Sequence, residues 1–153
     1  MKIADFIVGG DKVFIIAEIG NNHNGSYDLA LEMIDAAIVS GADCVKFQMR
    51  NMKSVYREKS LAKQGEDLGT EYILDLLERF QLTKDEHKKI AKYCDDKNIL
   101  YMCTPWDSDS IVALEALDVK VYKVASADLT NLPLIDNLIN TKKPLILSTG
   151  MSS

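Results

Sequence analysis

Two lysines and several hydroxyl side chains occupy short apolar segments in a way that could bind a small anion. Lys46 lies within residues 44–48 (CVKFQ), and Lys123 lies within residues 121–124 (VYKV). Hydroxyl residues stand at or just beyond the ends of such segments: Thr104, Ser126, Ser148 and Thr149. Lysine is seldom buried without an anionic partner, and hydroxyl groups donate well to phosphate and carboxylate oxygens. The combination favours a ligand that carries both groups, such as an enolpyruvyl phosphate.

Carboxylates near the same segments allow a second, purely structural interpretation. Glu18 ends the first apolar segment, and Asp128 follows Lys123 by five residues. Either carboxylate could neutralise a buried lysine, because buried charges are normally paired. From the residues alone, a ligand site and an internal ion pair both remain open.

The segments that carry these residues alternate with helical patterns. Five apolar runs are typical of buried parallel strands: residues 14–18, 44–48, 100–104, 121–124 and 145–148. Helical patterns cover residues 26–40 and begin again near Thr83, Asp107 and Asn131. Residues 49–82 interrupt the alternation with a long connection that includes a helical segment over 71–80. Such a connection is either functional or a solvated insertion.

Strand–helix alternation predicts a parallel sheet with right-handed crossovers. A doubly wound sheet would carry a glycine-rich first turn, but residues 20–25 (GNNHNG) do not match G-x-G-x-x-G. Period-two alternation places Lys46 and Gln48 on one side of their strand and Val45 and Phe47 on the other. Polar residues at every strand end are typical of the catalytic rim of a (β/α)8 barrel. We therefore predict an α/β fold of the TIM-barrel type. Because eight units need roughly 250 residues, the barrel is expected to be incomplete, with about five strands.

Composition excludes several classes of protein. The 153 residues suffice for one domain, and 18 basic against 23 acidic residues give a net charge of −5. This balance disfavours nucleic acid and anionic membranes as partners, and no apolar run is long enough to span a bilayer. The odd cysteine count without C-x-x-C spacing predicts reduced, buried thiols: Cys44, Cys94 and Cys103. We therefore expect a cytoplasmic protein, with both histidines, His23 and His87, in structural roles.

Five short blocks of sequence, spread over most of the chain, together carry a resemblance to one protein family. They are residues 16–25 (IAEIGNNHNG), 45–48 (VKFQ), 103–106 (CTPW), 122–128 (YKVASAD) and 147–151 (LSTGM). Together they resemble the sialic acid synthase family, which includes N-acetylneuraminate, legionaminic and pseudaminic acid synthases and spore-coat polysaccharide relatives.

The resemblance implies a function and a domain organisation. Members of the family condense phosphoenolpyruvate with an N-acetylated aminosugar, such as N-acetylmannosamine, to give a nonulosonic acid and phosphate, and they need a divalent metal, Mn²⁺ or Mg²⁺. They have a (β/α)8 barrel followed by an antifreeze-like domain. By this resemblance residues 1–153 are the N-terminal portion of the barrel, and the portion alone is expected to be inactive. The remaining strands, the C-terminal domain and the metal-binding histidines would lie outside this chain.

The resemblance also implies roles for individual residues. The phosphoenolpyruvate-binding residues would be Lys46, Thr104, Lys123, Ser126 and Ser148. Glu18, Asp128 and Lys123 would be catalytic, with Asp128 standing where the family commonly has Glu. Gln48 would lie beside the sugar.

The residues also allow two alternative functions and lead to an expectation about the oligomeric state. Lys123 or Lys46 could instead be the nucleophile of a Schiff-base aldolase, or the chain could be a non-catalytic half-barrel that serves as an assembly unit. Five strands cannot close a barrel, so the first and last strands would be edges. The inner face would also expose apolar residues such as Ile16, Cys44 and Val121. We therefore expect a homo-oligomer.

Overall fold

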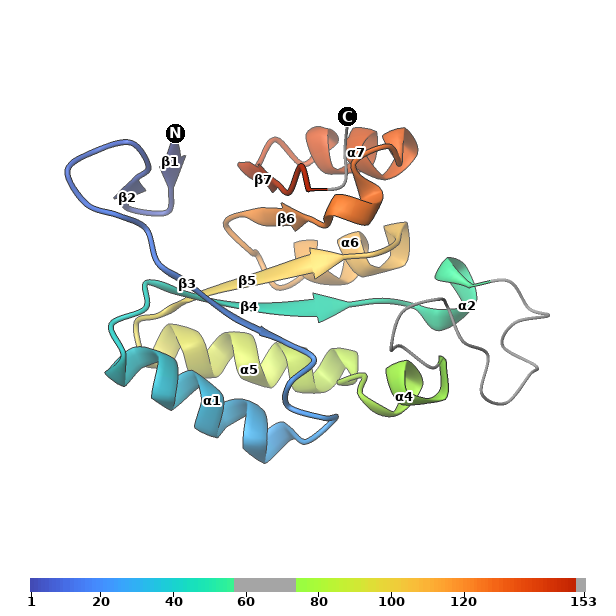
Figure 1. Cartoon of the computed structure of the whole chain (residues 1–153), viewed down its shortest axis with the longest axis horizontal. Helices are drawn as coiled ribbons and strands as arrows, with labels where there is room; N and C mark the ends of the chain where they lie inside the picture. Colours follow the sequence, from blue (N-terminus) through green and yellow to red (C-terminus); the bar gives the residue numbers. More distant parts are fainter. Residues whose placement is uncertain (57–73, 151–153) are drawn as a thin grey trace.

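Five parallel strands form the centre of the computed structural model, which describes residues 1–56 and 74–150 (Figure 1). The strands are β3 (Ile16–Gly20), β4 (Cys44–Met49), β5 (Leu100–Pro105), β6 (Tyr122–Val124) and β7 (Leu145–Leu147). Each strand pairs in parallel with its neighbour in sequence, in the order β3-β4-β5-β6-β7. This unbroken order is that of a barrel wall and not of a doubly wound sheet. The predicted incomplete α/β barrel is confirmed.

Helices join the strands, and those predicted over residues 26–40 and from Thr83, Asp107 and Asn131 are confirmed, whereas the short helix at Met52–Val55 and the 3₁₀ turn were not predicted. They are α1 (Tyr27–Val39), α2 (Met52–Val55), α4 (Leu74–Arg79), α5 (Lys84–Asp96), α6 (Ser108–Glu115) and α7 (Leu132–Asn140), with a 3₁₀ turn, η1 (Ser126–Asp128). Thr83 and Glu86 form the predicted capping box of α5. The start of the helical segment predicted over 71–80 lies outside the described residues. Within the described part of the chain, none of the helices has the length and hydropathy that crossing a membrane requires.

The two faces of the sheet bury different residues. One set alternates along the strands and packs under α1, α5, α6 and α7: Val45, Phe47, Tyr101, Cys103, Tyr122 and Val124. Burying a large apolar side chain stabilises a fold by about 1.5–3 kcal/mol, so this outer face is the main core. The alternate residues, Lys46 and Gln48 among them, therefore lie on the opposite face, which would line the lumen of a barrel.

A short hairpin that the sequence analysis did not predict covers one end of that inner face. Its strands are β1 (Lys2–Ile3) and β2 (Phe6–Ile7), and it lies beyond the amino-terminal ends of β4 and β5 (Figure 1). Ile3 is fully buried in a small cluster with Cys44, Met102 and Val121. The expectation that Cys44 and Val121 would be exposed is therefore wrong, because the hairpin covers them.

The three cysteines behave as the sequence predicts. Cys44, Cys94 and Cys103 are free and buried. Burial in apolar surroundings raises the pKa of Cys94 and of Cys103 to about 12. Neither thiol would ionise near neutral pH, so a nucleophilic role for them is disfavoured.

Candidate active site

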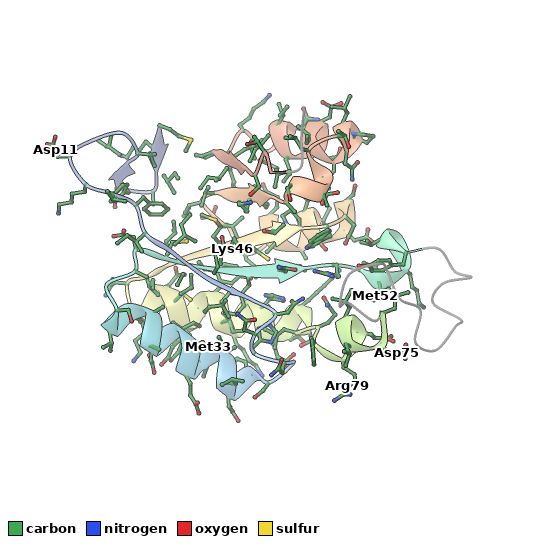
Figure 2. The ribbon with its side chains drawn as sticks, viewed as in Figure 1. Asp11, Met33, Lys46, Met52, Asp75 and Arg79 are labelled. Atoms are coloured by element: carbon green, nitrogen blue, oxygen red, sulfur yellow. The ribbon has the colours of Figure 1, made fainter. Side chains whose placement is uncertain are left out.

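Lys46 is the centre of a polar group in the middle of the inner face. The register pairs Glu18 of β3 with Lys46 of β4, and Lys46 with Met102 of β5. Lys46 Nζ lies 2.8 Å from Glu18 Oε2 and 3.4 Å from Thr104 Oγ1. Figure 2 shows Lys46 over the central strands, far from the loop after β2 that carries Asp11. The structure thus brings together three residues that the sequence singled out.

Lys123 forms the second half of this polar group. Its ammonium donates hydrogen bonds to the carbonyl oxygen of Val124, at 2.9 Å, and to Ser148 Oγ. The pKa of Lys123 is lowered, first because partial burial penalises the charge and second because the positive charge of Lys46 is near; Glu18 opposes this shift. The influence of Lys46 and Glu18 on the pKa of Lys123 indicates that Lys123 belongs to the same electrostatic site on the inner face.

Gln48 lies one step further along β4, toward the carboxyl-terminal end of the sheet. Its Oε1 accepts a hydrogen bond from the Arg50 guanidinium, which lies 4.6 Å from the centre of the Trp106 ring. On the other side, a β-bulge between Glu18 and Gly20 shifts the β3–β4 register. Arg50 was missed by the sequence analysis, although its spacing of two from Gln48 on an extended chain is a signal that could have found it.

Ser126 and Asp128 lie in η1, directly after β6. Asp128 is 9% exposed, and its Oδ1 accepts a hydrogen bond from Asn131 Nδ2 at 3.1 Å. Its Oδ2 is buried with no hydrogen-bond partner among the described residues. Among the described residues, no hydrogen bond joins Ser126 or Asp128 to Lys46 or Lys123. A buried, unpartnered carboxylate oxygen is costly, so this atom is suited to a ligand or water donor.

Both histidines lie on the outer side of β4, away from the lysines. His23 Nδ1 accepts a hydrogen bond from the Gly25 amide at 3.1 Å, and its ring lies 5.9 Å from the ring of Phe47. His87 Nδ1 lies 2.8 Å from the Tyr101 hydroxyl. Within residues 1–56 and 74–150, no three His, Cys, Asp or Glu side chains gather to hold a metal ion. The described residues therefore do not fit the divalent metal that the resemblance implies.

Comparisons with known proteins find relatives along most of the chain. Residues 33–153 match the NeuB family. The N,N'-diacetyllegionaminic acid synthase of Campylobacter jejuni is 36% identical over 145 residues, and the N-acetylneuraminate-9-phosphate synthase of Drosophila melanogaster is 33% identical over 164 aligned residues. These alignments cover 93% and 100% of this chain but only 43% and 42% of the relatives. The chain therefore spans about two-fifths of the length of these curated relatives.

Solved structures give the same result. The crystal structure of an N-acetylneuraminic acid synthetase from Leptospira borgpetersenii, in complex with citrate, superposes with a TM-score of 0.82 at 31% identity. The match covers 97% of this chain and 50% of that protein. A dihydropteroate synthetase superposes with a TM-score of 0.56 at 13% identity, a likeness that shows the fold alone.

Proposed function

Because the chain belongs to the NeuB family, we propose that it supplies the phosphoenolpyruvate-binding part of an enzyme that condenses this substrate with an N-acetylated aminosugar. The product would be a nonulosonic acid, with release of phosphate. One observation carries the proposal. Buried Lys46 and half-buried Lys123 lie on the same inner face, and the ammonium group of each lies close to a hydroxyl group.

The lysines would hold the two anionic groups of phosphoenolpyruvate. Lys46 with Thr104, and Lys123 with Ser148, present ammonium and hydroxyl donors that match carboxylate and phosphate oxygens. Ser126, in η1 just beyond β6, would add a further hydroxyl.

The chemistry would form one carbon–carbon bond and break one carbon–oxygen bond. The methylene carbon of phosphoenolpyruvate would attack the aldehyde carbon of the open-chain sugar, and water would add to the developing cation at C2. Phosphate would then leave with the C2–O bonding electrons, giving the 2-keto acid. The lysines would neutralise the charge on the departing phosphate.

Two carboxylates would serve the second substrate and the water. Glu18 is 59% exposed at its side chain although it pairs with buried Lys46, so its free oxygen can accept a hydrogen bond from a sugar hydroxyl. Asp128 Oδ2 would accept a proton from the attacking water. The Mn²⁺ or Mg²⁺ that the family resemblance implies would be held by residues outside the described ones, among which no three His, Cys, Asp or Glu side chains gather.

We also propose that residues 1–153 form five strands of a longer barrel. The support is the unbroken strand order and the share of the relatives that the chain spans. The test of function therefore uses the full protein that carries this chain. Phosphate release from phosphoenolpyruvate is measured with N-acetylmannosamine or a related aminosugar and Mn²⁺. Release that depends on the sugar supports the proposal, and its absence with every N-acetylated aminosugar tried contradicts it.

A Schiff-base aldolase is a second candidate because of one observation. The pKa of Lys123 is lowered by burial and by the charge of Lys46, and a lowered pKa is what activates a lysine as a nucleophile. Borohydride reduction in the presence of pyruvate would trap a covalent adduct on Lys123 if this candidate is correct. An unmodified protein by mass spectrometry would eliminate it.

A further inference from the structure

The Gln48 side-chain amide is oriented by its neighbour Arg50. An arginine guanidinium only donates hydrogen bonds, so the amide atom that faces Arg50 must be the oxygen, Oε1. The amide nitrogen, Nε2, must therefore face the opposite way. The orientation of this amide, which sequence alone leaves open, follows from the chemistry of one partner.

Arg50 is itself held in place by the end of the next strand. Its guanidinium carbon lies 4.6 Å from the centre of the Trp106 ring, a distance typical of a cation–π contact. Trp106 follows β5 directly, and its backbone amide donates to the carbonyl oxygen of Met49 at 3.0 Å. Because the backbone of Trp106 is anchored to the end of β4, contact with its ring limits the freedom of the guanidinium to release the Gln48 oxygen.

The Gln48 amide nitrogen lies against the end of β3. A Cβ placed on Gly20 would be 3.5 Å from Nε2, so the amide packs beside this glycine, two residues beyond Glu18. Gly20 has a φ of +58°, which favours glycine. Within residues 1–56 and 74–150 no group accepts a hydrogen bond from Nε2, while Oε1 is occupied. The amide thus presents a spare donor beside Gly20, at the end of β3.

We propose that Arg50 is a positioning residue that fixes Gln48 as a hydrogen-bond donor toward the second substrate. The inference rests on the proposed function, because it deepens the description of the same site. The site would select a sugar that places an acceptor oxygen, a hydroxyl or carbonyl oxygen, beside Gly20 and Gln48. A substrate with only a donor or an apolar group at this position would leave the amide unpaired and bind less tightly.

Steady-state kinetics of four variants of the full protein test the role of Arg50. Arg50→Ala should raise the KM for the aminosugar about tenfold, the effect of one hydrogen bond, and leave the KM for phosphoenolpyruvate unchanged. Arg50→Lys, which keeps a cationic donor, should recover part of the loss. Gln48→Glu still accepts from Arg50 but cannot donate, so it should lose at least as much sugar affinity as Arg50→Ala. Arg79→Ala, whose side chain points away from the sheet on α4 (Figure 2), is the matched control and should resemble the wild type.

Two outcomes would overturn the proposal: equal increases of both KM values in Arg50→Ala, or wild-type sugar affinity in Gln48→Glu. A readout independent of turnover separates this inference from the proposed function. In ¹⁵N-labelled protein, Arg50→Ala should shift the Gln48 side-chain amide resonances, and Arg79→Ala should not. If the wild type releases no phosphate, the proposed function fails, while these resonances still decide whether Arg50 orients the amide. Unchanged Gln48 resonances in Arg50→Ala would refute the orientation.

Discussion

Lys46 Nζ lies 2.8 Å from Glu18 Oε2, yet burial divides this ion pair unequally. The lysine side chain is 6% exposed, and the glutamate side chain is 59% exposed. Loss of the partner should therefore cost the lysine more than the glutamate. The lysine needs a counter-charge because it is buried, whereas the glutamate is largely solvated without it.

The first prediction concerns the stability of variants at this pair. Glu18→Gln leaves the buried ammonium with Thr104 Oγ1 as its remaining neutral partner and should lower the free energy of unfolding by about 2 kcal/mol. Lys46→Met removes the buried charge, keeps most of the aliphatic stem, and should change stability by less than about 1 kcal/mol. Urea denaturation measures both. The reverse order of the two losses would contradict the unequal burial.

The second prediction concerns Asp128, whose Oδ2 is buried without a partner among the described residues. If this oxygen handles the attacking water, Asp128→Asn should lose far more phosphate release than Asp128→Glu, because only the second keeps a carboxylate. Asn131→Ala, which removes the hydrogen bond to Oδ1, should give an intermediate loss. Equal losses in the Asn and Glu variants would show that the size of the side chain matters there and not its charge.

The third prediction is a pH dependence of stability from His87. Burial lowers the pKa of His87 to about 4, with the nearby His23 adding to the shift and Glu86 opposing it. The folded-state pKa lies below the ordinary value of about 6.5, so the unfolded chain takes up the proton first. The contribution of neutral His87 to the free energy of unfolding should be fully present above about pH 6.5. It should be lost by up to about 1.4 kcal/mol per pH unit as the pH falls toward 4.

A matched variant isolates this effect. His87→Gln keeps a polar partner for the Tyr101 hydroxyl but cannot take up a proton, so its stability should vary less between pH 6.5 and pH 4. The pKa of His23 is also lowered by burial, and a residual slope from that group is expected. Denaturation curves at several pH values measure the difference. Identical slopes in wild type and His87→Gln would contradict the prediction.

The fourth prediction concerns self-association of residues 1–153 expressed alone. Within the described residues, β3 and β7 each pair on one side only, and unpaired edges recruit other chains. An apolar groove of about 350 Å³ beside β3 is lined by residues that include Ala17, Ile19 and Met33. We expect oligomers by light scattering at micromolar concentration. A monodisperse 17.1 kDa species with a cooperative melt would contradict this expectation.

The sequence predicted the parts of the fold that follow from periodicity. Alternation within β4 placed Lys46 and Gln48 opposite Val45 and Phe47, and the structure buries the second pair under the helices. The first strand was predicted two residues too early, over 14–18, because its apolar run begins before the pairing with β4 does. β3 instead begins at Ile16 and continues past the bulge to Gly20.

The parts that the sequence did not predict depend on contacts between distant residues. Two-residue strands such as β1 and β2 have no period to detect, and the burial of Cys44 by Ile3 follows from tertiary packing. Likewise, Arg50 gains its place from Trp106, which is far away in sequence and adjacent in space because β4 and β5 pair. Lys46, Thr104 and Glu18 were each singled out from the sequence, and they lie together because parallel strands bring their carboxyl-terminal ends to one edge.

The central claim is that Lys46 and Lys123 bind phosphoenolpyruvate, and phosphate release by lysine variants of the full protein tests it most directly. Lys46→Ala and Lys123→Ala should each lower kcat/KM for phosphoenolpyruvate by about 10²–10³-fold, the usual cost of removing one electrostatic contact to a reacting group, while circular dichroism shows a folded protein. Lys92→Ala, which removes an exposed lysine paired with Asp96 on α5, should match the wild type. Wild-type turnover in either inner-face variant would contradict the claim.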